Sequence, residues 1–583
     1  MKFVLDRDHR VRYIRIMASL QAYTARGNRY WRIVESFRDA QGRPRLRVLR
    51  HVGTAQSMLQ QLSQAPGAPL YAEERDFGAI CALWNMAQEI QLVEIIDRHA
   101  PKRHQGASVG EYLLLAAMNR ALAPTSKRKL GAWYRGTVLP RWLPLPATAL
   151  RSQRFWDHMH SLKEATLAKI ESDLTRCLVE QQQVDIRALF YDTTNFDTFL
   201  DTENPSRLAR HGHAKSKRTD LRVVGLALLV SWDFHIPLFS QVYEGNQHDS
   251  VTFSQALDEL VARYQMFCQQ GEHITLVFDK GNNSEDNLHT LDASPYHFIG
   301  SLVPSQHQDL LDIPLEKFHY LKEASLRGVR VYRTEKEVCG GCRTVLITHS
   351  QALLRGQVRG IRQHLAKKLG ALAQLQGRVR QSRQPGWRGK PYTAESIQKQ
   401  IEGILSGQYL TEFLWVKIIH QDQRLDLEYG TDQQAYLRLK QRVLGKRILF
   451  TSNSELSDEQ IVLGYCGQHH VERAFREMKD PYFIRFSPAF HWTDAMIRVH
   501  AFYCVLALTL TALLHRRVRA AGLSMSLEQL LMHLKSIKEV TTFYPASNAP
   551  GKALGGRPRA ERTLTRLDAQ QKKILVALKI PLK

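Results

Sequence analysis

The segment from Gly464 to Asp480 carries a phenol, an amide, a carboxylate and an ammonium group at regular spacing. Tyr465, Glu472 and Lys479 stand seven residues apart, so on one continuous α-helix they would share a face over two turns. Gln468 would lie one turn after Tyr465 on the same side. A neighbouring apolar stripe would face a core: Val471, Phe475 and Met478. By itself, this pattern also fits a surface helix with ordinary ion pairs.

Two aspartates are candidates to join the Glu472 carboxylate. Asp192 lies in a strand-like run over residues 185–194, and Asp279 ends another over residues 273–281. Three carboxylates within a few ångströms raise one another's pKa values, and divalent cations would neutralise them. Mg²⁺ prefers such oxygen ligands, and Mn²⁺ is expected to substitute for it. Two ions roughly 4 Å apart would support in-line phosphodiester displacement by water or a 3′-hydroxyl.

The charge of the chain points to a polyanionic partner. Among 583 residues, Lys and Arg number 81 against 56 Asp and Glu, which gives a formal net charge of +25. A folded protein this basic most often binds nucleic acid, although a basic protein can also be merely soluble. The length exceeds what one core supports, so several domains are expected.

Cysteine usage and the apolar runs indicate a cytoplasmic protein without membrane association. Seven scattered cysteines argue against a disulfide framework. Cys339 and Cys342 flank a predicted hairpin turn, with a zinc or redox role as the alternative. The chain opens without a signal peptide, and the apolar run 501–514 is too short for a membrane span. That run is expected to be a buried helix.

Changes in hydrophobic periodicity predict how the chain is organised. The expected regions are a β-rich N-terminal region (1–75), a helical DNA-binding domain (76–183), a catalytic core in two parts (184–303 and 447–515), an insertion domain (304–446) and a C-terminal helical region (516–583). Basic loops such as Ser126–Lys129 suggest the DNA-binding role of the helical domain. The amphipathic C-terminal tail is a candidate dimer interface.

The order of elements in residues 184–303 predicts the fold class. Three strand-like runs that can form a meander precede a helix, a strand, a short helix and a further strand. This order matches an α/β fold with an RNase H-like mixed sheet, which a helix closes beside the first strands. In that arrangement the strands of Asp192 and Asp279 are neighbours, and a closing helix over 464–480 brings Glu472 to them.

These residues resemble bacterial insertion-sequence DDE transposases of the large group marked by a Y-(2)-R-(3)-E-(6)-K signature. Here the signature positions hold Tyr465, Gln468, Glu472 and Lys479, with Gln468 where the family usually has Arg. The resemblance covers roughly residues 185–515. It includes YDTT at 191–194, EGNQHD at 244–249, DKG at 279–281 and LFTSN at 449–453.

The resemblance implies roles for particular residues. Asp192, Asp279 and Glu472 would form the DDE triad and bind two Mg²⁺ ions. Tyr465 and Lys479 would contact the DNA of the transposon end. Three more positions are candidate DNA contacts: Lys280, Gln468 and Trp387. Lys280 would contact the same DNA strand as Tyr465 and Lys479. Trp387 lies in the basic, turn-rich stretch 384–392 and would stack on a flipped base.

Further basic side chains have two readings each. Arg473 and Arg476 lie on other faces of the predicted helix, where a structural role and a DNA-backbone role are both open. The basic stretches 207–222 and 355–390 are dense enough to neutralise several phosphates, and a solvated surface explains either one alone as well.

The sequence therefore predicts a DNA transposase that cuts and pastes its element, working as a homodimer on double-stranded DNA in the bacterial nucleoid. One alternative is a metal-dependent nuclease on the same fold, and another is a catalytically inactive repressor of the element. A tyrosine recombinase is a further alternative, because His470 and Arg473 spell H-x-x-R ahead of Tyr503. That reading leaves Asp192 and Asp279 unexplained.

Overall fold

The computed structural model describes most of the chain: residues 4–5, 11–12, 18–39, 41–64, 69–100, 106–201, 203–212, 214–264, 274–382, 384, 387, 389–390, 392–405, 409–421, 424–487, 489–545 and 558–581. The chain divides into two compact units. One contains Met1–Asp76 and Ile537–Leu567, and the other contains Phe77–Ser536 and Asp568–Leu582. The larger unit holds every candidate site residue predicted from the sequence.

The smaller unit is built from β-strands taken from both ends of the chain. Strands β3 (Ala18–Ala25), β4 (Asn28–Arg38) and β5 (Pro44–Gly53) form an antiparallel sheet, followed by helix α1 (Ala55–Gln64). A second sheet pairs β6 (Tyr71–Asp76) with β18 (Lys538–Tyr544), which in turn pairs with β19 (Arg559–Leu564). The predicted helical region over 516–583 contains helices but also the strands β18 and β19, which the sequence analysis did not predict. Strand β18 pairs with β6, which lies far away in the sequence, so its local pattern did not predict a strand.

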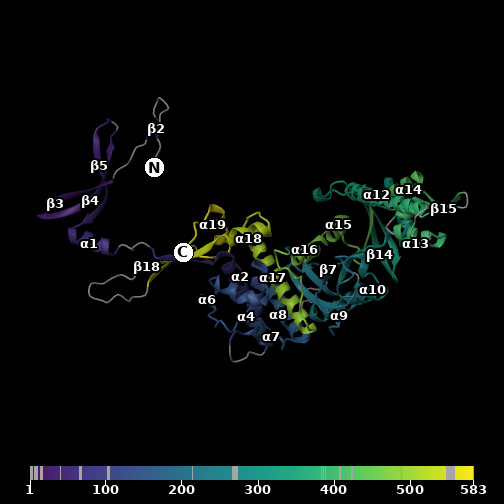
Figure 1. Ribbon diagram of the computed structural model, residues 1–583, viewed down its shortest axis with the longest axis horizontal. Helices are drawn as coiled ribbons and strands as arrows, with labels where there is room; N and C mark the ends of the chain where they lie inside the picture. Colours follow the sequence, from purple (N-terminus) through teal and green to yellow (C-terminus); the bar gives the residue numbers. More distant parts are fainter. Residues whose placement is uncertain are drawn as a thin grey trace. The chain divides into compact units, whose positions relative to one another are not determined.

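A nine-stranded mixed sheet organises the larger unit (Figure 1). Its strands are β7 (Ala188–Asp197), β8 (Val223–Ser231), β9 (Pro237–Glu244), β10 (Thr275–Val277), β11 (His297–Leu302), β12 (His319–Tyr320), β13 (Val329–Val338), β14 (Gly341–Ser350) and β17 (Lys446–Thr451). Their order is β12-β13-β14-β17-β11-β10-β7-β8-β9. Strands β7, β8 and β9 form the predicted antiparallel meander, and β10 lies parallel between β7 and β11.

The hairpin around Cys339 belongs to this sheet and not to a separate insertion. Cys339 and Gly340 both have positive φ, as a two-residue hairpin turn requires, so the predicted turn is confirmed. Strand β14 then pairs with β17 along its length, and most of its residues are buried. The boundary predicted at residue 304 is therefore too early, because local periodicity cannot reveal pairing with a strand about a hundred residues later.

Helices cover the sheet where the candidate residues lie. Helix α16 (His469–Lys479) packs against β7 and β8, and α15 (Asp458–Cys466) packs against β11 and β17. A capping box between Ser457 and Gln460 starts α15. All residues of β8 are buried, as expected for a strand covered on both faces. Other helices beside these strands are α9 (Asp249–Tyr264) and α10 (Glu285–Asp292).

The predicted continuous helix over 464–480 is wrong, because the chain makes two helices there. A tight turn at Gly467 and Gln468 separates α15 from α16, and Tyr465 and Glu472 lie on different helices. The turn passes so close to β7 that a Cβ on Gly467 would lie 2.4 Å from Cζ of Phe190 and 2.7 Å from the Trp232 ring. Only glycine fits this approach without a shift of the two rings.

We expect Gly467→Ala to lower the free energy of unfolding by about 1–3 kcal/mol, because the added methyl group overpacks the junction with Phe190 and Trp232. Urea denaturation monitored by circular dichroism would measure the change. Gly356→Ala is the matched control, since a Cβ on this helical glycine meets nothing within 4 Å. Equal denaturation midpoints for Gly467→Ala and the wild type would contradict the close packing.

The helical region after residue 76 packs around the long helix α17 (Asp494–Ala520). Its helices are α2 (Gly78–Glu89), α3 (Leu92–His99), α4 (Val109–Leu122), α5 (Lys127–Arg135), α6 (Leu139–Trp142), α7 (Ser152–Met159) and α8 (Glu164–Glu180). Among the described residues, α17 alone is long and apolar enough to cross a membrane by length and composition. Its most apolar stretch is 94% buried within the protein, which confirms the predicted buried helix over 501–514.

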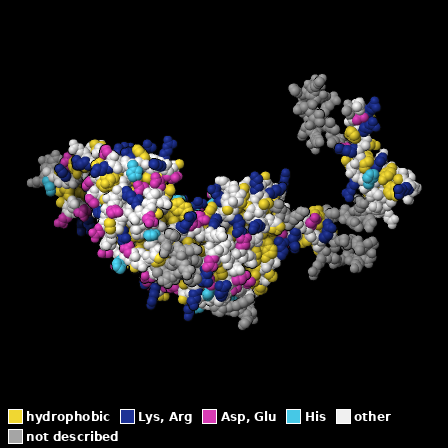
Figure 2. Space-filling model, turned by 180° about the vertical axis from the view of Figure 1, so that it is seen from behind, with side chains coloured by type: hydrophobic (Ala, Val, Ile, Leu, Met, Phe, Trp, Pro, Cys, Tyr) yellow, Lys and Arg dark blue, Asp and Glu magenta, His cyan; other side chains and the backbone are white. Residues whose placement is uncertain are grey.

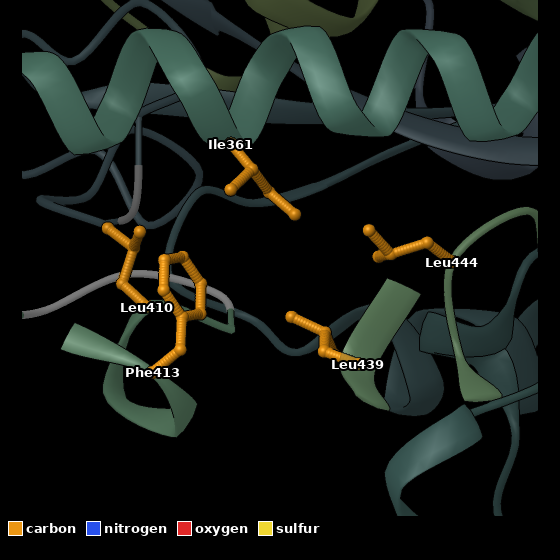
Figure 3. Close-up of a cluster of buried hydrophobic side chains, with 5 residues drawn as sticks. All are labelled: Ile361, Leu410, Phe413, Leu439 and Leu444. Atoms are coloured by element: carbon orange, nitrogen blue, oxygen red, sulfur yellow. The ribbon is translucent and has the colours of Figure 1, made fainter. Parts of the chain in front are cut away.

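The stretch between β14 and β17 has a core of its own. It contains α12 (Gln351–Gln381), α13 (Ala394–Leu405), β15 (Leu414–Gln421), β16 (Arg424–Thr431) and α14 (Gln433–Arg442). Figure 3 shows buried side chains from α12, α14 and the adjoining loops facing one interior space: Ile361, Leu410, Phe413, Leu439 and Leu444. A second cluster forms around Leu375 and Ile401.

The C-terminal helices use their apolar faces within the chain. Helix α19 (Ala569–Ala577) packs against α17 and α18 (Leu527–Lys535) and buries Ile574 and Leu575. The side chains that α19 buries are therefore used within the chain, and the dimer interface predicted for this tail stays a prediction. Amphipathic spacing alone did not distinguish an intramolecular partner from an intermolecular one.

Candidate functional site

The sheet places Asp192 and Asp279 at the same level of adjacent strands. Val277, the last residue of β10, pairs in parallel with Phe190 of β7, so Asp192 follows two residues later in β7 and Asp279 two residues later just past the end of β10. Both aspartates and Glu472 line one cavity of about 500 Å³. The structure thus brings together three carboxylates that lie far apart in the sequence.

The Asp192 carboxyl group has a raised pKa. Burial is the main cause that raises its pKa to about 6, and the nearby Asp279 and Asp249 carboxylates raise it further. The Lys215 ammonium group and the backbone N–H of Thr193, 2.7 Å from Oδ1, act in the opposite direction. A cation in the cavity would favour the ionised form of Asp192 more strongly than Lys215 does.

Asp279 is oriented by two hydroxyl groups. The Tyr465 hydroxyl lies 3.1 Å from Oδ1 of Asp279 and 2.9 Å from Oγ of Ser301, and Ser301 Oγ lies 3.3 Å from the same carboxylate oxygen. Burial and the Asp279 carboxylate raise the pKa of Tyr465 to about 12, so its hydroxyl remains a proton donor at neutral pH. The Arg447 guanidinium lies 5.1 Å from the centre of the Tyr465 ring, and this cation–π contact helps to hold the ring in place.

Glu472 reaches the cavity from the first turn of α16 and is exposed. No hydrogen bond or ion pair with a described residue engages its side chain. Gln468 also lines the cavity at the start of α16, and its buried Nε2 has no hydrogen-bond partner among the described residues. A carboxylate and an amide N–H donor, neither with a partner among the described residues, therefore face the same cavity. The carboxylate could bind a cation, and the amide could donate to an acceptor oxygen.

The three acids fit divalent cations by the chemistry of their oxygen donors and by the raised pKa of Asp192. Within the part of the chain that the structure describes, no three His, Cys, Asp or Glu side chains lie close enough together to form a ready-made metal centre. Asp279 lies close enough to Asp192 to raise its pKa, and Glu472 lines the same cavity.

The structure separates the predicted DNA-contact residues into two groups. Lys280, Gln468 and Tyr465 line the cavity with the carboxylates. The ammonium group of Lys479 instead donates to Oγ1 of Thr194 at 2.6 Å and lies 5.4 Å above the Phe196 ring. Burial of this group, and then the nearby Lys215, lower the pKa of Lys479.

Three other predicted residues do not line this cavity. Arg473 is paired with Glu477 on its own helix at 3.1 Å, which favours the structural reading of its role. Arg476 is exposed on α16. Trp387 is 39% exposed and lies outside the residues that surround the carboxylates.

Several side chains that shape the site were not predicted from the sequence. Asp249, at the start of α9, accepts a hydrogen bond of 2.8 Å from Oγ1 of Thr193 and lies close enough to raise the pKa of Asp192. Lys215 donates to the backbone oxygen of Thr193 at 2.6 Å. Ser301 and Arg447 support Tyr465. Two features of the sequence could have indicated these residues: Asp249 at the end of EGNQHD, and Ser301 in the largely apolar strand HFIGSL.

A comparison with known protein families agrees with this geometry. A family model described as "Transposase DDE domain" matches residues 185–508, which span the sheet, the cavity and most of α17. No curated protein matches the chain. Among solved structures, the chain is similar to a piggyBac transposase in a synaptic complex with hairpin DNA, determined by cryo-EM, at 9% sequence identity and a TM-score of 0.37. That match covers 80% of this chain and 82% of the other.

Proposed function

The chain belongs to the transposase DDE domain family, and we propose that it is a cut-and-paste DNA transposase in which Asp192, Asp279 and Glu472 are the catalytic triad. The observation that carries the proposal is the meeting of these three carboxylates in one cavity, from β7, the end of β10 and α16. The strand order of β7 to β11 and the helix packed on β7 support an RNase H-like core.

The proposed cofactor is a pair of Mg²⁺ ions, with Mn²⁺ as a substitute. Asp192, Asp279 and Glu472 would hold them. When bound, such ions supply charge stabilisation for in-line displacement at phosphorus and lower the pKa of an attacking oxygen. Tyr465 and Ser301 orient the Asp279 carboxylate through its Oδ1, and Thr193 does the same for Asp192 through its backbone N–H.

In the proposed reaction, the oxygen of a water molecule attacks a phosphodiester at the element end. The bond between phosphorus and the 3′ oxygen breaks, and this oxygen leaves as a 3′-hydroxyl. That hydroxyl then attacks a phosphodiester of target DNA in the same cavity, forming a new P–O bond while the target's own 3′ oxygen leaves. Lys280 and the Gln468 amide line this cavity and are suited to bind nonbridging phosphate oxygens.

The long helix α12 is suited to carry the DNA away from the cavity. Leu353 and Gln357, near its start, line the cavity, and Tyr409 joins them from a later loop of the insertion. Basic side chains are exposed along the rest of the helix, among them Arg355, Arg359, Arg362 and Lys367. Figure 2 shows Lys and Arg spread widely over the face in view, with Asp and Glu between them. Non-specific contacts with a DNA backbone are expected from such a surface.

The remaining parts of the proposal follow from the substrate. Membership of the insertion-sequence group marked by the Y-(2)-R-(3)-E-(6)-K signature rests on Tyr465, Gln468, Glu472 and Lys479. Two ends must be paired for strand transfer, so we expect a dimer on DNA through a surface other than the buried face of α19. DNA as the substrate implies location at the bacterial nucleoid in the cytoplasm, without membrane association.

We expect Tyr465→Phe to lower the rate of DNA cleavage about 10–100-fold at limiting Mg²⁺, because Asp279 loses one of its orienting hydroxyl groups. Cleavage rates measured across a Mg²⁺ titration would test this, and excess Mg²⁺ should recover part of the loss. Tyr320→Phe is a matched control, since Tyr320 is 61% exposed and does not line the cavity. An unchanged Mg²⁺ dependence in Tyr465→Phe would contradict the orienting role.

The function is tested with DNA that flanks the gene, taken to include the element ends. The full-length protein is incubated with this DNA and Mg²⁺, and both strand cleavage and joining to a target plasmid are followed. Discrete Mg²⁺-dependent cleavage with joining supports the transposase. Cleavage without joining would favour a nuclease, and tight binding without any chemistry would favour a repressor.

A further inference from the structure

A second cavity, of about 430 Å³, lies in the larger unit between the helical region and α17. Five Lys and Arg side chains line it: Arg120, Lys127, Arg128, Lys129 and Arg485. No Asp or Glu is among the described residues that line it, and none of the five forms an ion pair with a described carboxylate. The cavity therefore concentrates positive charge that the described part of the protein does not neutralise.

Lys127 is the most telling of these residues. Its side chain is 6% exposed, and its Nζ has no hydrogen-bond partner among the described residues. Nζ lies over the faces of two aromatic rings, 4.1 Å from the ring centre of Tyr503 and 5.0 Å from that of Phe155. Burial and the neighbouring Arg120 lower the pKa of the Lys127 amine well below its usual value. The cavity therefore disfavours the charged form of Lys127 when it is empty, and an anion beside the amine would favour that form.

Arg120 fixes an unusual backbone segment at the edge of the same cavity. Its Nη1 donates to the Arg485 carbonyl oxygen at 2.9 Å, and its own carbonyl oxygen accepts from the Ile484 N–H at 3.1 Å. Ile484 and Arg485 both have positive φ, near +50°, which is strained for side chains other than glycine. Nε of Arg120 is buried without a partner among the described residues. The strained turn thus places Arg485 at the same cavity as Nε of Arg120, the second donor there without a partner after Nζ of Lys127.

The start of helix α5 adds backbone donors. Ser126 is its N-cap residue, but the Ser126 side chain makes no capping hydrogen bond. The Lys129 N–H donates to the Ser126 oxygen at 2.9 Å, whereas the N–H groups of Lys127 and Arg128 precede this first hydrogen bond of the helix. The positive end of the helix dipole favours an anion there. Ser126 and the three basic residues after it all line the cavity. Trp156 and His491 add ring surfaces to the lining, and His491 Nδ1 is also buried without a partner in the described part of the chain.

Hydrogen bonds connect this cavity to the elements that carry the triad. The loop between α16 and α17 supplies Arg485 and His491, and it is tied to the end of β7 by the Phe199 N–H, which donates to the Ala489 oxygen at 3.0 Å. The same loop is tied to α16 by the Phe486 N–H, which donates to the Met478 oxygen at 2.9 Å. A ligand held here would therefore have a fixed position relative to the strand of Asp192 and the helix of Glu472.

We propose that this cavity is a phosphate-binding site, separate from the carboxylate cavity, that takes a backbone phosphate of the DNA substrate. Nζ of Lys127 and Nε of Arg120, which have no partner among the described residues, supply donors for the nonbridging oxygens together with the start of α5 and Arg485. The assignment to DNA rests on the proposed transposase function. The assignment to a phosphate group rests on the cavity alone.

Two measurements on the full-length protein test the site. In the first, melting temperature is followed as inorganic phosphate is added at constant ionic strength without DNA. In the second, the affinity for a random-sequence DNA duplex is measured over a range of salt concentrations. The variants are Lys127→Met, which keeps the buried stem and removes the charge, and Ser126→Asp. Aspartate is a good N-cap residue, so Ser126→Asp preserves the start of α5 and repels an anion.

Lys163→Gln is the matched control, because Lys163 is exposed in the same helical region and does not line the cavity. We expect phosphate to raise the melting temperature of the wild type and of Lys163→Gln, and of neither cavity variant. We also expect the slope of log affinity against log salt to fall in the cavity variants, by about 0.9 for each DNA phosphate that they no longer bind.

The outcomes separate the site from the function. No effect of phosphate on the wild type, together with equal salt slopes in all variants, would overturn the site. Stabilisation by phosphate that depends on Lys127, with unchanged salt slopes, would overturn DNA as the source and leave a small phosphate compound as the ligand. If the wild type binds no DNA at all, the transposase proposal fails, and the phosphate titration still decides the cavity.

Discussion

Glu472→Gln is expected to reduce cleavage of element-end DNA by about 10²–10³-fold or more while leaving DNA affinity nearly unchanged. The amide keeps the size of the side chain and removes the charge that would complete the set with Asp192 and Asp279. Glu472 is exposed and has no described partner, so the change removes no contact that the fold uses. Single-turnover cleavage rates and a binding assay in Ca²⁺ would measure the two effects separately.

The matched control for this variant is Glu528→Gln, the same substitution on an exposed residue of α18. It should cleave at the wild-type rate. Full activity of Glu472→Gln would show that this residue is not part of the triad, although α16 packs against the strand of Asp192. Loss of DNA binding together with cleavage would instead show that Glu472 organises the DNA-binding surface.

Asp192→Asn is expected to abolish cleavage and yet to stabilise the metal-free protein at neutral pH. The pKa of Asp192 is raised to about 6 by burial, so above that pH the folded protein must hold a desolvated carboxylate that is fully solvated after unfolding. The stabilising effect of the protonated form is complete below the ordinary pKa near 3.8 and is lost as the pH rises through about 6.

The asparagine variant lacks this titration. In EDTA its melting temperature should exceed that of the wild type by about 2–4 °C at pH 7.5, which corresponds to roughly 1–2 kcal/mol, and the difference should vanish near pH 4. Added Mg²⁺ should raise the melting temperature of the wild type and have little effect on Asp192→Asn.

Asp258→Asn is the matched control, because Asp258 is exposed on α9. It should show neither the pH-dependent difference nor the altered response to Mg²⁺. A metal-free Asp192→Asn protein that is less stable than the wild type at pH 7.5 would contradict the account of a desolvated carboxylate. Retained cleavage would contradict its place in the triad.

Local pattern in the sequence was sufficient for elements whose partners lie nearby. The meander β7-β8-β9, the capping box at Ser457 and the turn at Cys339 all depend on neighbours within a short stretch of chain. Pairing of β14 with β17 and of β6 with β18 was missed, because those partners are separated by a long stretch of sequence. No periodicity within one strand identifies a distant partner.

The site was predicted to a similar extent. The three carboxylates lie where the element order put them, because parallel pairing of β7 and β10 aligns Asp192 with Asp279. The orientation of Tyr465 toward Asp279 could not be derived from helical spacing, since it depends on the break at Gly467 that puts Tyr465 on α15. The proximity of Asp249 to Asp192 depends on how α9 begins, which composition does not reveal.

The insertion leaves and re-enters the sheet at one point. His349 of β14 pairs with Lys446 of β17, and the Ser350 N–H donates to the Gly445 oxygen at 2.9 Å. In terms of modular design, residues 351–445 are an exchangeable cassette, because a short turn from Ser350 to Lys446 would close β14 and β17 as a plain hairpin. The triad residues lie outside the cassette, whereas Leu353, Gln357 and Tyr409 lie within it and face the cavity. Changes within the cassette would therefore reshape the wall of the cavity and leave the three carboxylates in place.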